Sequence, residues 1–193
     1  ILFSRFYKTN KKNSMKKFLL IAIILSALAS QSCLKNYGTI RVPLTVEQYF
    51  DVNLTSGVTT FSEMKLIDLS QDSTLIKYES NINEYIIKSA ELFVTSYTGS
   101  QDCSFTGDIS YSADNSNTPI AFASASNFKF YELFVSGDAY TTSLIIEEQS
   151  NFSDLIISDK SFFAYMNGSV TDSPINTTIK LVLEIEVVAN ILE

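Results

Sequence analysis

The chain contains no histidine among its 193 residues, and this absence excludes several kinds of active site. Histidine is the commonest general base, a usual zinc ligand and a member of the Ser-His-Asp and Cys-His catalytic groups. Enzymes that work without it are mainly glycosidases, which use two carboxylates. The enzyme class that the composition leaves open is therefore a carboxylate-dependent polysaccharide hydrolase.

Tryptophan is also absent, and glycine and proline are scarce, with six and three residues. The lack of tryptophan removes a hallmark of antibody domains and disfavours a carbohydrate-binding module, which often stacks sugars on Trp. The glycine-rich phosphate loops G-x-x-x-x-G-K-[ST] and G-x-G-x-x-G do not occur, so we expect no nucleotide or other cofactor. The scarcity of Pro and Gly argues for a folded chain rather than a disordered one.

Residues 15–33, MKKFLLIAIILSALASQSC, have the three parts of an export signal. Lys16 and Lys17 form its positive end, residues 18–28 form a short apolar run, and small residues follow. The apolar run is about half the ~20 residues that a transmembrane helix needs, so we do not expect a membrane-spanning anchor. Residues 1–14 lack an initiating Met, and we interpret them as an upstream extension outside the mature protein.

The sequence SQSC at 30–33 resembles the lipobox of bacterial lipoproteins. The resemblance implies that residues 15–32 are removed as a signal peptide and that Cys33 receives a diacylglyceryl group. In that family an aliphatic residue is usual at the position that Ser30 occupies here. An A-x-A pattern ending at Ala29 also fits ordinary signal peptidase, and cleavage there, which would release a soluble protein, remains an alternative.

Cysteine usage agrees with a lipid anchor. The chain has two cysteines, Cys33 and Cys103. If the sulfur of Cys33 carries lipid, Cys103 has no partner within the chain, and an unpaired thiol in an oxidising compartment is usually buried. The alternative is a disulfide between the two cysteines in a secreted form without lipid.

The chain that follows the signal is strongly acidic. From Cys33 onward 8 Lys and Arg face 21 Asp and Glu, a net charge of −13, whereas the whole chain has a net charge of −7. Binding to nucleic acid requires Lys and Arg to neutralise phosphates, and adsorption to anionic lipid headgroups requires the same residue types. The charge therefore disfavours nucleic acid as a partner.

Apolar and polar residues alternate with a period of two along much of the remaining chain, which is typical of half-buried strands. The clearest run is 178–187, in which Ile, Leu and Val alternate with Thr, Lys and Glu. The polar residues 98–102 predict a turn that joins two strands into a hairpin, and 70–78 has the spacing of a short helix capped by Ser70. The other predicted strands are 40–44, 50–54, 85–97, 105–111 and 162–170.

Seven or more short strands predict a mainly-β fold, a β-sandwich of immunoglobulin-like kind with one or two short helices. Residues 128–135 and 144–157 fit a strand or a helix equally well. We expect residues 33–39 to be a tether and residues 40–193 to be a single domain, because about 160 residues suit one core.

Two sets of carboxylates are candidate sites, and neither has a catalytic arrangement. Glu147 and Glu148 are adjacent, so on a strand they face opposite ways. Glu184 and Glu186 share the polar face of the last predicted strand, where solvated charges are ordinary. The acidic turn at 112–117 lacks the order of an EF-hand calcium loop. We expect no catalytic residue and no metal ligand.

The densest aromatic cluster lies in the segment that starts at Phe128. Its spacing is typical of core residues, and a patch for a partner is the alternative. The cluster consists of Phe128, Phe130, Tyr131 and Phe134.

The chain as a whole is low in Gly, Ala and Arg and high in Ile, Asn, Ser and Lys. With Lys16, Lys17 and Cys33 it is similar to small envelope lipoproteins of the Bacteroidota. The resemblance implies a cell-envelope location, in the outer membrane, with a secreted or periplasmic soluble protein as the alternative. The D-[ST]-x pattern of O-glycosylation known in that group also fits Ser73, so we list Ser73 as a modification candidate.

Our leading hypothesis from the sequence is a non-enzymatic lipoprotein that is held at the membrane through Cys33. Its partner would be an envelope protein or a glycan. Two alternatives come from other classes: the polysaccharide hydrolase named above, and a structural subunit of a surface fibre in which strand exchange links copies of the protein. A long unpaired terminal strand would favour the fibre.

Overall fold

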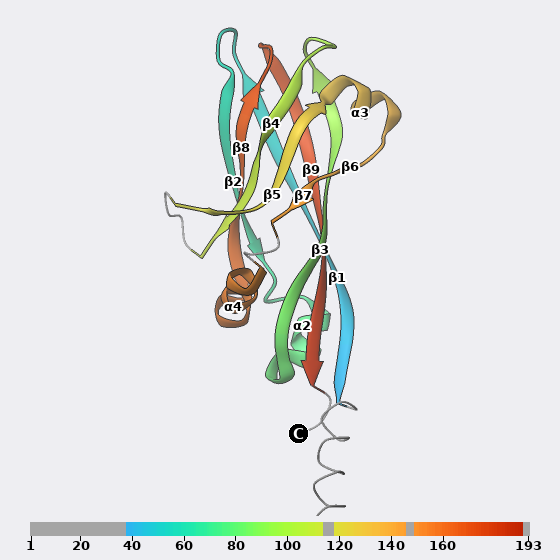
Figure 1. Ribbon diagram of the computed structural model, residues 1–193, viewed down its shortest axis with the longest axis vertical. Helices are drawn as coiled ribbons and strands as arrows, with labels where there is room; N and C mark the ends of the chain where they lie inside the picture. The colour runs from blue at the N-terminus through green and yellow to red at the C-terminus, as the bar shows by residue number, and fades with distance from the viewer. Residues whose placement is uncertain (1–37, 114–117, 146–148, 191–193) are drawn as a thin grey trace, which may run out of the picture. The chain divides into compact units, whose positions relative to one another are not determined.

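The alternating segments form β-strands over the residues that the computed structural model describes, which are 38–113, 118–145 and 149–190 (Figure 1). Three α-helices and one 3-10 turn join them in this part of the chain. The elements are β1 (Thr39–Leu54), β2 (Thr60–Asp68), α2 (Ser73–Tyr78), η1 (Glu79–Asn81), β3 (Ile82–Thr98), β4 (Ser104–Ser112), β5 (Ile120–Lys129), α3 (Phe130–Ser136), β6 (Tyr140–Thr141), β7 (Ser143–Leu144), α4 (Gln149–Asp159), β8 (Ser161–Val170) and β9 (Ile175–Asn190).

The strands form two sheets, which confirms the predicted mainly-β sandwich. The first sheet has the order β1-β9-β3-β6 and the second has the order β2-β8-β4-β5-β7. Strands that follow one another along the chain mostly lie in opposite sheets, as β1 and β2, β3 and β4, and β8 and β9 do. This order is that of a jelly roll, a sandwich in which two Greek keys are wound together.

The prediction that the turn at 98–102 joins two strands into a hairpin is wrong. β3 pairs with β9 and β6 in the first sheet, whereas β4 pairs with β5 and β8 in the second. The segment between β3 and β4 therefore crosses from one sheet to the other. A polar turn sequence shows only that the chain reverses direction, and which strand it then pairs with depends on contacts far away along the chain.

The core lies between the sheets, and β9 supplies its longest continuous row. Its inward side chains are at most 1% exposed, as the alternation predicts. Each of them faces the second sheet, because successive side chains of a strand point to opposite faces. The row consists of Ile179, Leu181, Leu183, Ile185 and Val187.

β1 is one long strand of 16 residues where the sequence predicted two. The even-numbered apolar residues from Leu44 to Leu54 all face the core, so the period of two continues without a break. Pro43 interrupts neither the strand nor the ladder, because β1 lies at the edge of its sheet and proline is tolerated there.

The outer face of the first sheet carries cross-strand pairs of charged and polar side chains. Glu186 of β9 pairs with Arg41 of β1 and lies 3.8 Å from the Nζ of Lys88 in β3. Lys180 of β9 lies 3.3 Å from a carboxylate oxygen of Glu47 in β1. Because the higher-numbered partner in β9 faces the lower-numbered one in β1, the two strands run antiparallel.

The helices settle the segments that the sequence left open. The segment 128–135 ends β5 and becomes α3, and 144–157 begins at the last residue of β7 and contains most of α4. The predicted helix at 70–78 is α2, but its cap is Asp72 rather than Ser70. The carboxylate of Asp72 accepts a hydrogen bond from the Leu75 N–H at 3.1 Å, which satisfies a backbone donor of the first turn.

Candidate functional site

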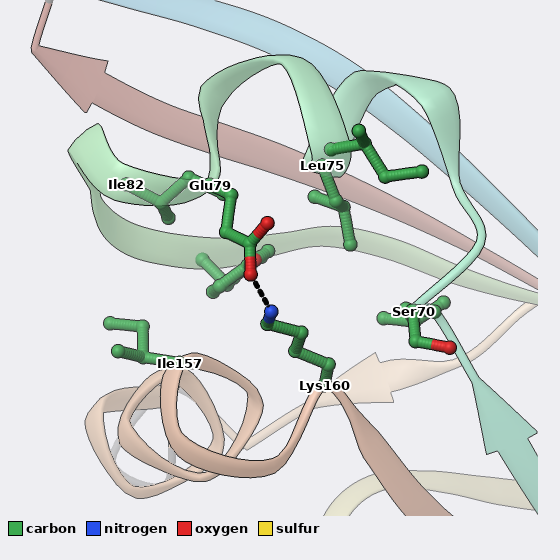
Figure 2. A pocket seen from close by; sticks show the side chains of 9 residues that line it. Ser70, Leu75, Glu79, Ile82, Ile157 and Lys160 are labelled. Carbon is green, nitrogen blue, oxygen red and sulfur yellow. Dashed lines mark hydrogen bonds and ion pairs between the residues drawn. The ribbon is translucent and has the colours of Figure 1, made fainter.

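The first candidate site is a small pocket between α2, η1 and the end of α4 (Figure 2). α4 ends at Asp159, and the next residue, Lys160, has a left-handed φ of 54° and an N–H that donates to the Ile156 carbonyl at 3.0 Å. The Lys160 carbonyl accepts a hydrogen bond from the Leu69 N–H at 2.8 Å. This C-terminal cap therefore ties α4 to the chain segment that leads into α2.

The pocket is apolar inside and charged at its rim. Figure 2 shows Lys160 and Glu79 pointing toward each other across it, and they form an ion pair. Its volume is about 40 Å³, far below the ~300 Å³ at which ligand pockets begin. It has room for water but not for a substrate. The apolar lining residues are Leu69, Leu75, Ile76, Ile82 and Ile157, with Tyr85 beside them.

Tyr85 is the titratable group that this environment changes most. Its side chain is 2% exposed, and its backbone N–H donates to the buried Ser153 hydroxyl of α4 at 2.8 Å. Burial raises the pKa of the Tyr85 phenol to about 12, and the negative charge of Asp72 adds to the shift. A phenol held neutral in this way acts as a structural group at physiological pH rather than as a base.

We expect Tyr85 to make the fold sensitive to alkaline pH. Its folded pKa of about 12 lies above the ordinary value of 10.0, so its contribution is complete below pH 10 and is lost as the pH rises to 12. The loss is roughly 2 to 3 kcal/mol, at about 1.4 kcal/mol per pKa unit. Urea unfolding at several pH values would show it as a slope that Tyr85→Phe flattens.

Tyr49→Phe is the matched control for this measurement, because Tyr49 is exposed. That variant should keep the alkaline slope of the unchanged protein. An equal slope in the Tyr85→Phe variant and the unchanged protein would contradict the assignment to Tyr85.

A second, more open hollow lies beside α3, with a volume of about 480 Å³ that falls in the range of ligand sites. Tyr140 fixes its wall, because its hydroxyl donates to the Ser126 carbonyl at 2.9 Å and accepts from the Ser126 N–H at 3.0 Å. Asn127 adopts a left-handed φ of 54° at its rim. The polar lining residues are Asn127, Lys129, Glu132, Ser136, Asp138 and Tyr140.

The aromatic cluster predicted near this hollow is divided between core and surface. Phe128 and Phe130 are fully buried, and their rings meet edge to face at 5.3 Å between centroids. Their alternative role in an exposed patch is therefore wrong, and their interpretation as core residues is confirmed. Tyr131 is half-buried and Phe134 is exposed. Because α3 begins at Phe130, strand spacing does not place these residues on one face.

The other predicted residues are scattered over the molecule. Ser73 is exposed at the first position of α2, where its hydroxyl is accessible to modification. Cys103 is a free and fully buried thiol, as expected for an unpaired cysteine, and its Sγ lies 3.3 Å from the Asp172 carbonyl oxygen. Cys33 lies outside the described residues.

The acidic residues do not assemble into a catalytic or metal-binding group in the described part of the chain. Glu186 is neutralised by two cations, while Glu184 is exposed on the same strand face. Among the described residues there is no group of three or more Cys, Asp or Glu that could hold a metal ion. Glu147, Glu148 and the turn at 114–117 lie outside those residues.

Neither hollow has a signal in the sequence. The pocket of Figure 2 depends on α4, whose segment fits a strand equally well, and on an ion pair between residues 81 positions apart. The hollow beside α3 depends on the left-handed backbone at Asn127. Asn adopts the left-handed region more often than most residues do, but an Asn in a sequence does not by itself predict that conformation.

None of the helices described between residues 38 and 190 is long and apolar enough to cross a membrane. No protein-family model matches the chain, and no curated protein matches it.

Several solved structures of viral coat proteins resemble the chain slightly. The decameric BFDV capsid protein is 13% identical, with a TM-score of 0.38 over 77% of this chain and 98% of that one. The Cocksfoot mottle virus structure is 14% identical, with a TM-score of 0.38 over 81% and 86%. Desmodium yellow mottle tymovirus is 13% identical, with a TM-score of 0.31 over 79% and 85%. Likenesses this slight carry no information about function.

Proposed function

We propose that this protein is a lipoprotein of the bacterial cell envelope, anchored through Cys33, whose β-sandwich has a non-enzymatic binding or structural role. The observation that carries the proposal is the predicted export segment at 15–33, which ends in Cys33, with six residues between it and Ile40. Ile40 already belongs to the folded unit Ile40–Asn190. So short a link suits a domain held at a membrane surface by its first residue.

The described residues support the non-enzymatic part of the proposal. Every buried side-chain nitrogen or oxygen among them has a hydrogen-bond partner, so none of these atoms needs a substrate to supply one. The enclosed pocket is too small for a substrate, and its Lys160 and Glu79 already neutralise each other. Asp68 has a pKa lowered by hydrogen bonds from Ser70, the opposite of the shift that a general acid needs.

The hollow beside α3 is the place we assign to a partner in this proposal. Its volume and its mixed lining of Lys129, Glu132 and Asp138 suit a polar ligand such as a glycan or a segment of an envelope protein. This assignment names the surface that binds the partner. The placement of that partner in the cell envelope depends on the anchor at Cys33.

The anchor is tested by changing the cysteine. We expect Cys33→Ala to move the protein almost completely from the membrane fraction to the soluble envelope fraction, because the acyl chains supply the membrane affinity. Fractionation and mass spectrometry of the mature N-terminus measure it. The unchanged chain should begin with acylated Cys33, whereas cleavage after Ala29 would give an unmodified Ser30.

Ser32→Ala is the matched control, because alanine keeps a small residue before the cysteine. This variant should stay in the membrane fraction. If Cys33→Ala fractionates like the unchanged protein, or if the mature chain begins at Ser30, the anchor is wrong and a soluble envelope or secreted protein takes its place.

The fibre subunit is a weaker candidate, which the position of β1 favours. β1 has 16 residues and lies at the edge of its sheet, so one of its two sides is open. The strand is nevertheless paired with β9, and its outward residues include Pro43, Arg41 and Glu47. Proline and charges on an edge strand are the features by which proteins avoid pairing with further strands.

A further inference from the structure

We propose that the end of the sandwich formed by α2, η1 and the last turn of α4 rests on the bilayer surface, with Ile76 and Ile157 as its apolar contacts. The inference rests on the lipidation of Cys33 proposed above and concerns which end of the domain the anchor holds against the lipid. The six residues between Cys33 and Ile40 reach at most roughly 25 Å when fully extended. The start of β1 therefore stays close to the bilayer.

The elements in question lie at the end of the sandwich where β1 starts. The pairs of Arg41 with Glu186 and of Glu47 with Lys180 set β1 antiparallel to β9, so the start of β1 adjoins the end of β9. The end of β9 pairs in turn with the start of β3, where Ile82 is opposite Ala189. α2 and η1 lead directly into β3, and Figure 1 shows α2 toward the end of the sandwich where β1 starts.

α4 reaches this end as well. Ser153 of α4 accepts a hydrogen bond from the N–H of Tyr85, which is the fourth residue of β3. At the end of the same helix, Lys160 forms its ion pair with Glu79 of η1. The two helical segments thus meet beside the start of β3, with the pocket of Figure 2 between them.

The surface at this end combines apolar and cationic side chains. Ile76 of α2 is 55% exposed and Ile157 of α4 is 41% exposed, and both line the pocket. Branched apolar side chains enter the boundary between headgroups and acyl chains. Lys77 follows Ile76 in the chain, and a lysine stem lies along apolar surface while its ammonium group reaches phosphate. Lys160 is held in its ion pair with Glu79 and is not counted among these cations.

The charge of the protein decides which lipid suits this surface. With a net charge of −13 from Cys33 onward, the domain is repelled by anionic headgroups and fits zwitterionic ones. Two isoleucines alone bind a bilayer weakly. The lipid anchor compensates for this weak binding, because it holds the isoleucines next to the bilayer and so raises their effective concentration there.

The test uses the lipidated full chain in phosphatidylcholine vesicles and a fluorescent label on one added thiol. The variants are Ile76→Cys, Ile157→Cys and, as the matched control, Val135→Cys. Val135 is 66% exposed in α3, which begins where Phe130 stacks on Tyr97 near the far end of β3. Selective labelling is possible because lipid blocks Cys33 and Cys103 is fully buried.

We expect lipids with a nitroxide in the acyl chain to quench the labels at 76 and 157 several-fold more strongly than the label at 135. Phosphatidylglycerol in the vesicles should reduce this difference. If the protein floats with the vesicles but its labels are quenched equally, or most strongly at 135, the orientation is wrong and the anchor stands. If the lipidation is absent and the protein does not float, the anchor and this inference are both overturned.

Discussion

Replacing Gly107 by alanine is expected to lower the free energy of unfolding by at least about 3 kcal/mol, at the upper end of the cost of overpacking a core. Gly107 of β4 is paired with Gly168 of β8. A Cβ at Gly107 would lie 2.1 Å from the backbone oxygen of Asn167 and 2.6 Å from the ring of Phe105. The backbone oxygen cannot rotate away, so the two strands would have to separate.

Gly168→Ala should be comparably damaging, for a related reason. A Cβ there would lie 2.2 Å from the Phe105 ring and 2.5 Å from the Thr106 backbone oxygen. The two glycines leave the space that the fully buried Phe105 ring occupies, in contact with Phe61 at 5.3 Å between centroids. The pair therefore links the register of β4 and β8 to the packing of one core ring.

Urea unfolding of these two variants, of a control and of a double variant measures this effect. Gly57→Ala is the matched control, because nothing lies within 4 Å of its added Cβ and only its φ of 86° is unfavourable, a cost of roughly 1 to 2 kcal/mol. Phe105→Leu should not rescue Gly107→Ala, since the closest obstacle is backbone. A loss below that of Gly57→Ala, or full rescue by Phe105→Leu, would show that the strands accommodate the methyl group.

Replacing Phe152 by alanine is expected to cost about 3 to 5 kcal/mol, the range measured for buried Phe in other proteins. Phe152 is one of two fully buried apolar residues of α4, with Ile156, and its ring contacts the second sheet. Its ring centroid lies 5.1 Å from that of Tyr111, 6.0 Å from that of Phe122 and 5.2 Å from that of Phe162. Truncation leaves a cavity that these three rings cannot close.

The matched control is Ile157→Ala on the same helix, because Ile157 is largely outside the core and its loss should cost under about 1 kcal/mol. Hydrogen exchange should also show faster opening at the Tyr85 N–H in the Phe152 variant, since its acceptor Ser153 is the neighbouring residue of α4. Equal stability losses in the two variants would mean that α4 is not attached to the core through Phe152.

The class of fold could be predicted because half-buried strands leave a local pattern. The row from Ile179 to Val187 is legible in the sequence, since each residue alternates between core and solvent. The structure of the segment from Phe128 onward is not legible in the sequence, because its four aromatic residues fit both the strand period and the helix period. The chain changes from strand to helix at Phe130. The helix cap was misplaced from Asp72 to Ser70 because both residue types serve as caps.

The candidate sites were less predictable than the fold. The pocket of Figure 2 needs Glu79 and Lys160 side by side, and the hollow beside α3 needs Asn127 near Asp138. Neither of these two arrangements of residues from separate parts of the chain produces a periodic pattern of apolar and polar residues in the sequence. Phe128 and Phe130 are the opposite case. They belong to an aromatic cluster for which a surface patch is the alternative interpretation, and the structure buries them in the core.

Taken alone, the sequence determined the acidic charge, the lack of histidine chemistry and the alternation that makes strands, and it carried the prediction of an export segment ending in Cys33. These properties belong to residue types and to neighbours along the chain. Only the tertiary structure decided that β3 and β4 lie in different sheets, that Gly107 meets Gly168, and that α2 and α4 lie where β1 begins. Those relations arise because strands pair and pack across long separations, where burial of the whole core selects the partner.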